Sequence, residues 1–318
     1  MNQKNWGDKP YHSMDYALKE AYGEKLYRIT LNAGLTCPNR DGTVGKGGCT
    51  FCSVEGSGDF AGDKCLSITE QLYLGKQILQ KKRPVNAFIA YFQAFSNTYA
   101  PIPVLRELYE QAISDPQIKI LAIATRPDCL DENVLSLLQQ VHIHKPVWIE
   151  LGLQTIHPDT AKAIRRGYPL ALFEEKVKHL RVMNIPVIVH VILGLPGETT
   201  DDMLQTIEYL NHQNIQGIKL QVLHVLRNTD LAELYLENPF RILTKEEYIS
   251  LLGQCIARLN PEIVIHRLTG DGPKNLLIAP LWSQKKRTVL NQLHQYLKSQ
   301  DIWQGKELIT YERKAYPL

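Results

Sequence analysis

The sequence contains no run of 18 consecutive apolar residues, so it predicts no membrane-spanning helix. The segment Met1–Tyr11 is polar and charged, and it lacks the apolar core of a secretory signal peptide. These two absences predict a cytoplasmic protein without a membrane partner, in a compartment that keeps thiols reduced. The six cysteines are therefore expected to be metal ligands, nucleophiles or ordinary buried residues rather than disulfides.

A strong excess of either charge is also missing. The chain has 36 Lys and Arg against 33 Asp and Glu, a formal net charge of +3. This balance permits a nucleic-acid partner but does not argue for one, because any footprint would have to be a local patch. We find no internal repeat and no low-complexity linker. At 318 residues the chain can bury one large core, with or without an appendage.

Apolar segments alternate with segments of helical pattern along most of the chain. Near-continuous apolar segments predict parallel strands that are buried on both faces, and the segments between them predict crossover helices. The predicted strands are 25–33, 85–93, 118–125, 146–155, 185–193 and 217–225. The predicted helices are 16–22, 67–82, 101–114, 131–141, 157–166, 170–183 and 200–213. Ser67 and Glu70 have the spacing of a capping box at the start of the second helix.

Six strand–helix units are fewer than the eight of a closed TIM barrel, so this α/β chain is expected to form an open, partial (β/α)6 barrel. We expect a helical lead-in over 1–24, the barrel over 25–239, and a C-terminal α/β extension packed on it over 240–318. In the extension, the pattern predicts helices over 244–259 and 284–298 and strands over 262–268 and 302–311. The chemistry should lie at the C-terminal ends of the barrel strands, where the loops converge.

Three cysteines, Cys37, Cys49 and Cys52, lie within sixteen residues directly after the first predicted strand. A [4Fe–4S] cluster needs a ligand on each iron, so three thiolates would leave one iron open. That iron could bind S-adenosylmethionine (SAM), whose reductive cleavage yields a 5′-deoxyadenosyl radical. Phe51 would form an apolar wall beside the cluster. The alternative is a structural zinc site with Cys65 as its fourth ligand; the position after the first barrel strand favours the cluster.

Polar side chains share one face on several of the apolar strands, which predicts a polar lumen. Glu150, Gly152 and Gln154 alternate along one strand, and Gly152 would let a ligand approach. For one such residue alone, a satisfied structural hydrogen bond is the better explanation, but repetition over several strands favours a ligand site. The other residues that carry this signal are Arg28, Thr30, Asn32, Tyr91, Gln93, His190, Lys219 and Gln221.

The stretch Cys-Pro-Asn-Arg-Asp-Gly-Thr over 37–43, followed by Gly-Gly-Cys-Thr-Phe-Cys over 47–52, resembles the cysteine motif of radical SAM enzymes with a lengthened first spacing. It looks like the YtqA/YhcC branch, which is similar to the radical domain of the Elongator catalytic subunit. Thr125-Arg126-Pro127-Asp128, at the end of the third strand, resembles the Elongator-type motif at that position. The resemblance implies a [4Fe–4S] cluster and SAM as cofactors, with a reductant such as flavodoxin or ferredoxin.

The resemblance also implies roles for single residues. Gln154 and Arg166 match a Gln…Arg pair that contacts SAM, with Arg166 suited to its carboxylate; one of Arg165 and Arg166 is then expected to be a solvated surface charge. The segment 191–199, which includes Gly194, looks like the fifth-strand motif that flanks adenine and ribose, and His190 stands where several relatives have an acid. The remaining expected cofactor contacts are Gln93, at the place of the usual glycine-rich motif, Glu150 and Gln221.

Three functions stay open on this reading. Enzymes of the Elongator kind act on the side chain of wobble uridine in tRNA, so the first hypothesis is a radical enzyme that modifies tRNA. The tRNA would be bound by the barrel rim and the C-terminal helices. The basic residues 285–287 beside Trp282 are the candidate RNA patch. The second hypothesis is a radical enzyme acting on a small metabolite or a peptide. The third is a zinc-stabilised binding module without redox chemistry.

Overall fold

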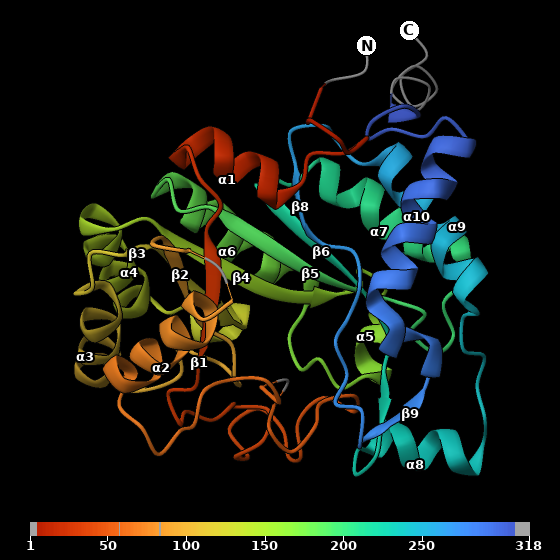
Figure 1. The fold of residues 1–318 in the computed structure, drawn as a ribbon. Helices are drawn as coiled ribbons and strands as arrows, with labels where there is room; N and C mark the ends of the chain where they lie inside the picture. Colours follow the sequence, from red (N-terminus) through yellow and green to blue (C-terminus); the bar gives the residue numbers. More distant parts are fainter. Residues whose placement is uncertain (1–4, 57, 83, 309–318) are drawn as a thin grey trace, which may run out of the picture. The chain divides into compact units, whose positions relative to one another are not determined.

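A computed structural model describes residues 5–56, 58–82 and 84–308. Seven strands within this part of the chain form one sheet, in the order β1-β2-β3-β4-β5-β6-β8 (Figure 1). The first six are the predicted barrel strands, and the seventh comes from the region that we predicted to be an extension. Their bounds are β1 Tyr27–Leu31, β2 Phe88–Phe92, β3 Ile118–Thr125, β4 Val147–Gln154, β5 Val187–Leu193, β6 Gly217–Val222 and β8 Val264–Arg267.

Helices connect successive strands of the sheet, as predicted. The capping box is present: the Ser67 hydroxyl accepts from the Glu70 N–H at 3.2 Å, and the Glu70 carboxylate accepts from the Ser67 N–H at 2.8 Å. Within the described residues, no helix combines the length and apolarity needed to cross a bilayer. The α-helices are α1 Met14–Tyr22, α2 Ile68–Gln80, α3 Ile102–Ile113, α4 Glu132–His144, α5 Pro158–Ala163, α6 Leu170–Val182, α7 Thr200–Asn211, α8 Asp230–Glu237, α9 Lys245–Arg258 and α10 Lys286–Ser299.

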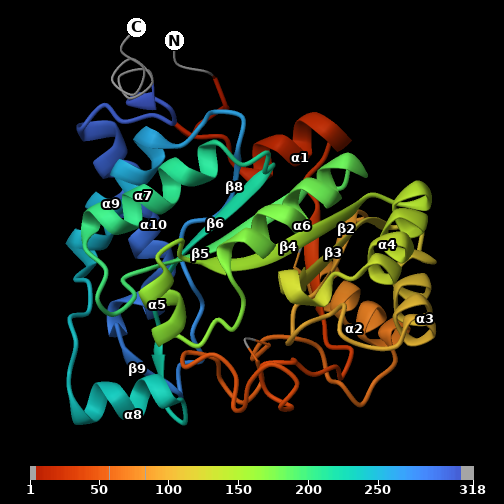
Figure 2. The same ribbon diagram turned by 180° about the vertical axis from the view of Figure 1, so that it is seen from behind.

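The chain divides into two compact units, which we describe separately. The cysteine unit comprises residues 18–152 and 162–189, and the C-terminal unit comprises residues 1–17, 153–161 and 190–318. In the cysteine unit, the paired strands from β1 to β4 run parallel, with α2 packed against β1 and α3 against β3 (Figure 2). All five residues of β2 are buried, as expected for a strand that is covered on both faces.

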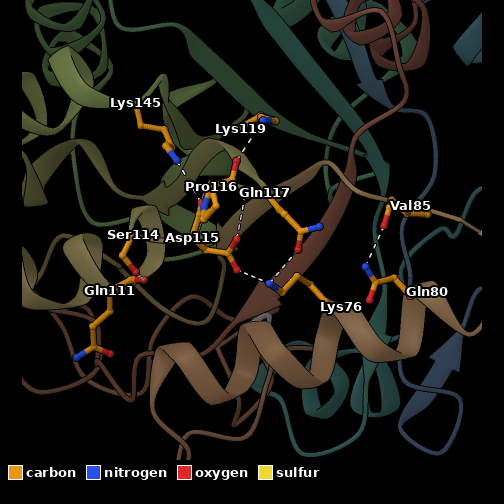
Figure 3. A network of polar contacts seen from close by, with 10 residues as sticks. All are labelled: Lys76, Gln80, Val85, Gln111, Ser114, Asp115, Pro116, Gln117, Lys119 and Lys145. Atoms are coloured by element: carbon orange, nitrogen blue, oxygen red, sulfur yellow. Dashed lines mark hydrogen bonds and ion pairs between the residues drawn. The ribbon is translucent and has the colours of Figure 1, made fainter.

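A polar network supports the cysteine unit at the N-terminal end of β3 (Figure 3). Lys76 of α2 forms an ion pair with Asp115 and donates to the side-chain oxygen of Gln117 at 3.2 Å. Lys145, which follows α4, donates to the backbone carbonyl of Asp115 at 3.3 Å. The network therefore ties two helices to the start of β3, at the end of the strand opposite to Thr125 and the Arg126 motif.

The C-terminal unit contains the parallel pair β6 and β8 and a small antiparallel pair, β7 Val225–Leu226 and β9 Leu277–Ala279. Helix α9 packs against α7 and α10. His224, in the turn before β7, has its Nε2 3.1 Å from the Ser283 hydroxyl, and burial lowers its pKa to about 4. Its imidazole is therefore neutral at physiological pH and serves as part of the folded framework.

The terminal strand predicted over 302–311 is wrong for the described part of that segment: residues 302–307 form irregular backbone and turns, and Leu308 is helical. Residues 309–311 lie outside the described residues. Asp301 has a φ of +52° and Gly305 a φ of +82°, and left-handed residues at these positions interrupt an extended strand. The segment is held by its side chains instead. The buried amide of Gln304 donates to the carbonyls of Asn260 and Ile263, both at 2.8 Å.

Candidate functional site

The three cysteines of the motif lie in the loop between β1 and α2 of the cysteine unit, and all three are half-buried free thiols. The Cys49 and Cys52 thiols are hydrogen-bonded to each other, and the Cys52 N–H donates to the Cys49 carbonyl at 3.0 Å. Cys37 and Cys49 both lie near enough to Arg126 for their charges to act on it. Cys65, the predicted fourth ligand of the zinc alternative, is exposed.

Arg40 folds the loop back on itself. Its guanidinium donates to the carbonyl of Cys52 at 3.3 Å and also to the carbonyl of Ser53. Gly48 has a φ of +90°, and a Cβ there would lie 2.9 Å from Arg40 Nε. Position 48 therefore requires glycine for two reasons, its left-handed backbone and the close approach of the arginine.

Asn39 ties the loop to a distant segment of the same unit. Its Nδ2 donates to the backbone carbonyl of Arg165 at 2.6 Å and to the Cys49 sulfur at 3.4 Å. A Cβ at Gly45 would lie 2.4 Å from Asn39 Oδ1, so the lengthened loop needs glycine where it passes this side chain. The sequence analysis missed Asn39, because its partner Arg165 is 126 residues away in the chain.

The electrostatic surroundings favour a thiolate at Cys49. The hydrogen bond with Cys52 is the largest cause that lowers the pKa of Cys49, to about 6; burial opposes it, and the charge of Arg126 and the Asn39 hydrogen bond add to it. Thiolates with hydrogen bonds to sulfur are the donor set that iron–sulfur clusters use, so the loop fits such a group. Among the residues that the structure describes, no three His, Cys, Asp or Glu side chains are placed to hold a single metal ion.

Two buried arginines flank one tyrosine beside the loop. The guanidinium of Arg126 lies 5.1 Å from the centre of the Tyr168 ring, and that of Arg166 lies 4.7 Å from it. Arg166 is 3% exposed, as suits a residue predicted to meet a cofactor. Arg165 is half-buried, and its charge helps to lower the pKa of Cys49. The prediction that one of Arg165 and Arg166 is a solvated surface charge is therefore wrong.

The polar face predicted on the first strands is present in the cysteine unit. Glu150 is buried and forms an ion pair with Arg28 at 3.1 Å, and the Arg28 guanidinium lies 5.0 Å from the centre of the Tyr91 ring. Glu150 thus has a protein partner, and its contact with a cofactor stays a prediction. Gln93, directly after β2, and Phe51 are half-buried, and their cofactor contacts likewise stay predictions.

The other predicted cofactor contacts, Gln154, His190, Gly194 and Gln221, belong to the C-terminal unit. Gln154 ends β4 with a φ of +64°, and His190 lies half-buried within β5. The side-chain oxygen of Gln221 accepts from Arg267 Nη1 at 3.5 Å. That these residues share one ligand with the cysteine unit stays a prediction.

The backbone conformation and local packing at position 194 account for the glycine there. Its φ is +89°, its N–H donates to the Met203 sulfur at 3.0 Å, and a Cβ there would lie 3.1 Å from Leu243 Cδ1. Glu198 lies in the same segment 191–199 and was not among the predicted site residues. Burial raises the pKa of this carboxyl, and hydrogen bonds from Thr155 and Thr160 oppose that rise.

Comparison with known proteins identifies the class. Residues 36–210 match the model of the Radical SAM superfamily, and residues 215–299 match the Radical_SAM C-terminal domain. Because the first match spans more than half of the chain, the protein belongs to the radical SAM superfamily. Enzymes of this superfamily use a [4Fe–4S] cluster and SAM and need a reductant, so the predicted cofactors are confirmed.

Two individual proteins show how similar the chain is to members of this superfamily. The chain is 40% identical over 299 residues to the YtqA protein of Bacillus subtilis, covering 94% of this chain and 93% of YtqA. It is 27% identical to Elongator complex protein 3 of Schizosaccharomyces pombe over 161 residues, which is 49% of this chain and 29% of that protein. The predicted family resemblance is confirmed.

A solved structure shows the same fold. The Elp3 protein of the archaeon Methanocaldococcus infernus, with its N-terminus deleted, matches with a TM-score of 0.68 at 14% identity, over 88% of this chain and 64% of that chain. At this identity the match concerns the fold alone. It confirms the predicted fold class, a partial barrel of parallel strands with a C-terminal extension.

The ion pair between Arg28 and Glu150 allows a test of whether Glu150 supports the fold. Glu150→Gln should lower the free energy of unfolding by about 3 kcal/mol, because it leaves the Arg28 charge without its buried partner. Urea denaturation in the absence of SAM measures this change. Glu110→Gln, which breaks the exposed 3.9 Å pair with Arg106, is the matched control and should cost less than about 0.5 kcal/mol. Equal stability of the Glu150 variant and wild type would show that the ion pair does not support the fold.

Proposed function

We propose that this protein is a radical SAM enzyme that modifies the side chain of wobble uridine in tRNA. The observation that carries the proposal is the sequence similarity to Elongator complex protein 3 over 161 residues, together with the motif 125–128 at the end of β3. Enzymes of the Elongator kind, by the resemblance described above, act on that uridine. The setting would be the cytoplasm, with flavodoxin or ferredoxin as the electron donor.

In this proposal Cys37, Cys49 and Cys52 hold the cluster, and Asn39 and Arg40 hold the three cysteines in place. Arg166 would bind the carboxylate of SAM, because a guanidinium buried beside the loop offers a paired hydrogen-bond donor to a carboxylate. The two cofactors together supply radical chemistry at an unactivated C–H bond. The further cofactor contacts proposed are Phe51, Gln93, Glu150, Gln154, His190, Gly194 and Gln221.

The ligand assignment predicts a change in iron content. Wild-type protein purified without oxygen should carry about four iron atoms per chain. Replacing Cys37, Cys49 or Cys52 singly by alanine should remove most of that iron, because each of these thiolates binds an iron. Cys65→Ala, at the exposed cysteine of the same region, is the matched control and should keep wild-type iron. Full iron in Cys37→Ala would refute the assignment, and zinc in place of iron would support the binding-module alternative.

The surface that could meet RNA lies around the loop 270–276 of the C-terminal unit. Arg227 is exposed, and its N–H donates to the Leu276 carbonyl at 2.7 Å, which places it beside this loop. Lys286 pairs with Asp271 at 2.7 Å, which brings the start of α10 to the same loop. Lys285 and Arg287, on either side of Lys286, are exposed. This local gathering of cations supports contact with a phosphate backbone.

Trp282, which the sequence analysis placed beside the basic residues of the candidate RNA patch, makes contacts within the C-terminal unit instead. Its indole N–H donates to the Leu243 carbonyl at 3.0 Å, and its ring packs against Tyr248 with the centroids 5.3 Å apart. The side chain therefore anchors the turn before α10 to the core of the C-terminal unit. The basic residues of the predicted patch remain as candidates, and the aromatic residue has a structural role.

The basic surface predicts a salt-dependent effect on tRNA binding. The double variant Lys285→Gln/Arg287→Gln should weaken binding and reduce the slope of log K against log salt by roughly 1 to 2, since each lost phosphate contact removes close to one counterion from the exchange. The pair Lys81→Gln/Lys82→Gln, at two exposed lysines after α2, removes the same charge elsewhere. Equal slopes for the two double variants would show that the surface around α10 does not contact tRNA.

The substrate is tested by comparing modified nucleosides in tRNA from cells with and without the gene. We expect one wobble-uridine derivative to disappear and its precursor to accumulate, and a copy carrying Cys49→Ala should fail to restore the profile. If the protein is expressed and carries its iron, and the tRNA nucleosides are the same with and without the gene, the tRNA proposal is refuted. That result would favour a small metabolite or a peptide as the substrate.

A further inference from the structure

Arg126 is a buried cation whose position is set by the end of β3. It comes directly after Thr125, the last residue of that strand, and just before the short 3₁₀ helix Pro127–Cys129. It is 9% exposed. Its Nε and Nη2 donate to the two carboxylate oxygens of Asp128 at 2.9 and 2.6 Å, in the paired geometry that gives a guanidinium one fixed orientation.

Two further contacts fix the same guanidinium. It lies 5.1 Å from the centre of the Tyr168 ring, which stacks against it. Gly167 has a φ of +81°, and a Cβ at that position would lie 3.3 Å from Arg126 Nη2. A side chain at position 167 would press on the guanidinium, and Arg126 cannot move its charge without breaking the Asp128 pair.

The fixed charge acts on the thiols of the motif. A Cβ at Gly167 would lie 3.3 Å from Arg126 Nη2 and 3.2 Å from Asn39 Oδ1, so the guanidinium is a near neighbour of Asn39. The Asn39 Nδ2 in turn donates to the Cys49 sulfur at 3.4 Å, which places the Arg126 charge close to the thiols of the motif. Reduction of a cluster bound there would add one negative charge next to this cation. A nearby positive charge stabilises the reduced state, and a nearby negative charge opposes it, because the reduction potential of a cluster follows its electrostatic surroundings.

We propose that Arg126 and Asp128 together set the reduction potential of the [4Fe–4S] cluster, with Arg126 raising it and Asp128 moderating that effect. Both are positioning residues, since neither is a ligand. The Nε–Nη2 edge of Arg126 is already occupied by Asp128, so this guanidinium acts as a fixed charge rather than as a paired donor to a substrate carboxylate. The proposal rests on the cluster site of the proposed function and is independent of the tRNA substrate.

The test is a redox titration followed by electron paramagnetic resonance on the anaerobically reconstituted full chain, without SAM. Arg126→Gln should shift the midpoint potential to a more negative value, and Asp128→Asn should shift it to a more positive value. The double variant removes one charge of each sign, so its midpoint potential should be close to that of wild type. Arg106→Gln, at a cation on α3 whose side chain is 42% exposed, is the control and should leave the midpoint unchanged.

Iron content is measured first, because a purely structural role would lower cluster occupancy without moving the midpoint in opposite directions. Arg126→Gln and Asp128→Asn with wild-type iron and wild-type midpoints would overturn the proposal. So would failure of both variants to take up iron, which would make the pair a structural clamp. Wild-type protein without iron would overturn the cluster assignment itself. An unchanged nucleoside profile alongside the expected shifts would count against the tRNA substrate only.

Discussion

The hydrogen bonds of Asn39 and Arg40 hold the cysteine loop at the end of β1, and the candidate site is built around that loop. A segment with eleven residues between its first two cysteines has many conformations available, and ordering them costs free energy. Asn39 joins the loop to the backbone of Arg165, and Arg40 closes it onto the carbonyls of Cys52 and Ser53. These hydrogen bonds restrict the conformations open to the loop that carries the three thiols.

Three arginines lie in the neighbourhood of the cysteine loop, and two of them, Arg126 and Arg165, act electrostatically on Cys49. Arg126, Arg165 and Arg166 come from two segments that are far apart in the chain, and all three belong to the cysteine unit. Buried cations are costly unless they are paired, and here the partners are a carboxylate, an aromatic ring and the thiols. The positive charge of Arg126 would also stabilise a cluster whose thiolates carry negative charge.

Apolar runs and helix signals predicted most of the fold. The six barrel strands were found because a strand covered on both faces, such as β2, is apolar at every position. β8 was expected only in an extension, because a strand as short as Val264–Arg267 does not show from its pattern that it joins the sheet. The terminal strand failed because Gly305, inside the predicted segment, adopts a left-handed conformation, which glycine permits but does not require.

The position of the cysteine loop was predictable from the sequence, and the contacts that support the loop were less so. The three cysteines and the Arg126 motif are visible as spacing and local sequence. The contact of Asn39 with Arg165, the stacking of Arg126 on Tyr168 and the inward anchoring of Trp282 depend on tertiary packing. Residue types alone do not specify which partner such side chains find. The ion pair of Glu150 with Arg28 likewise depends on tertiary packing, and the contact of Glu150 with a cofactor stays a prediction.

The central claim is that three thiolates hold a cluster with one iron left open for SAM. It is tested most directly by recording the electron paramagnetic resonance spectrum of the reduced protein before and after adding SAM. The account predicts a [4Fe–4S] signal whose g-values shift when SAM is added, because a ligand then occupies the open iron. A cluster signal that SAM leaves unchanged, at full iron content, would contradict it.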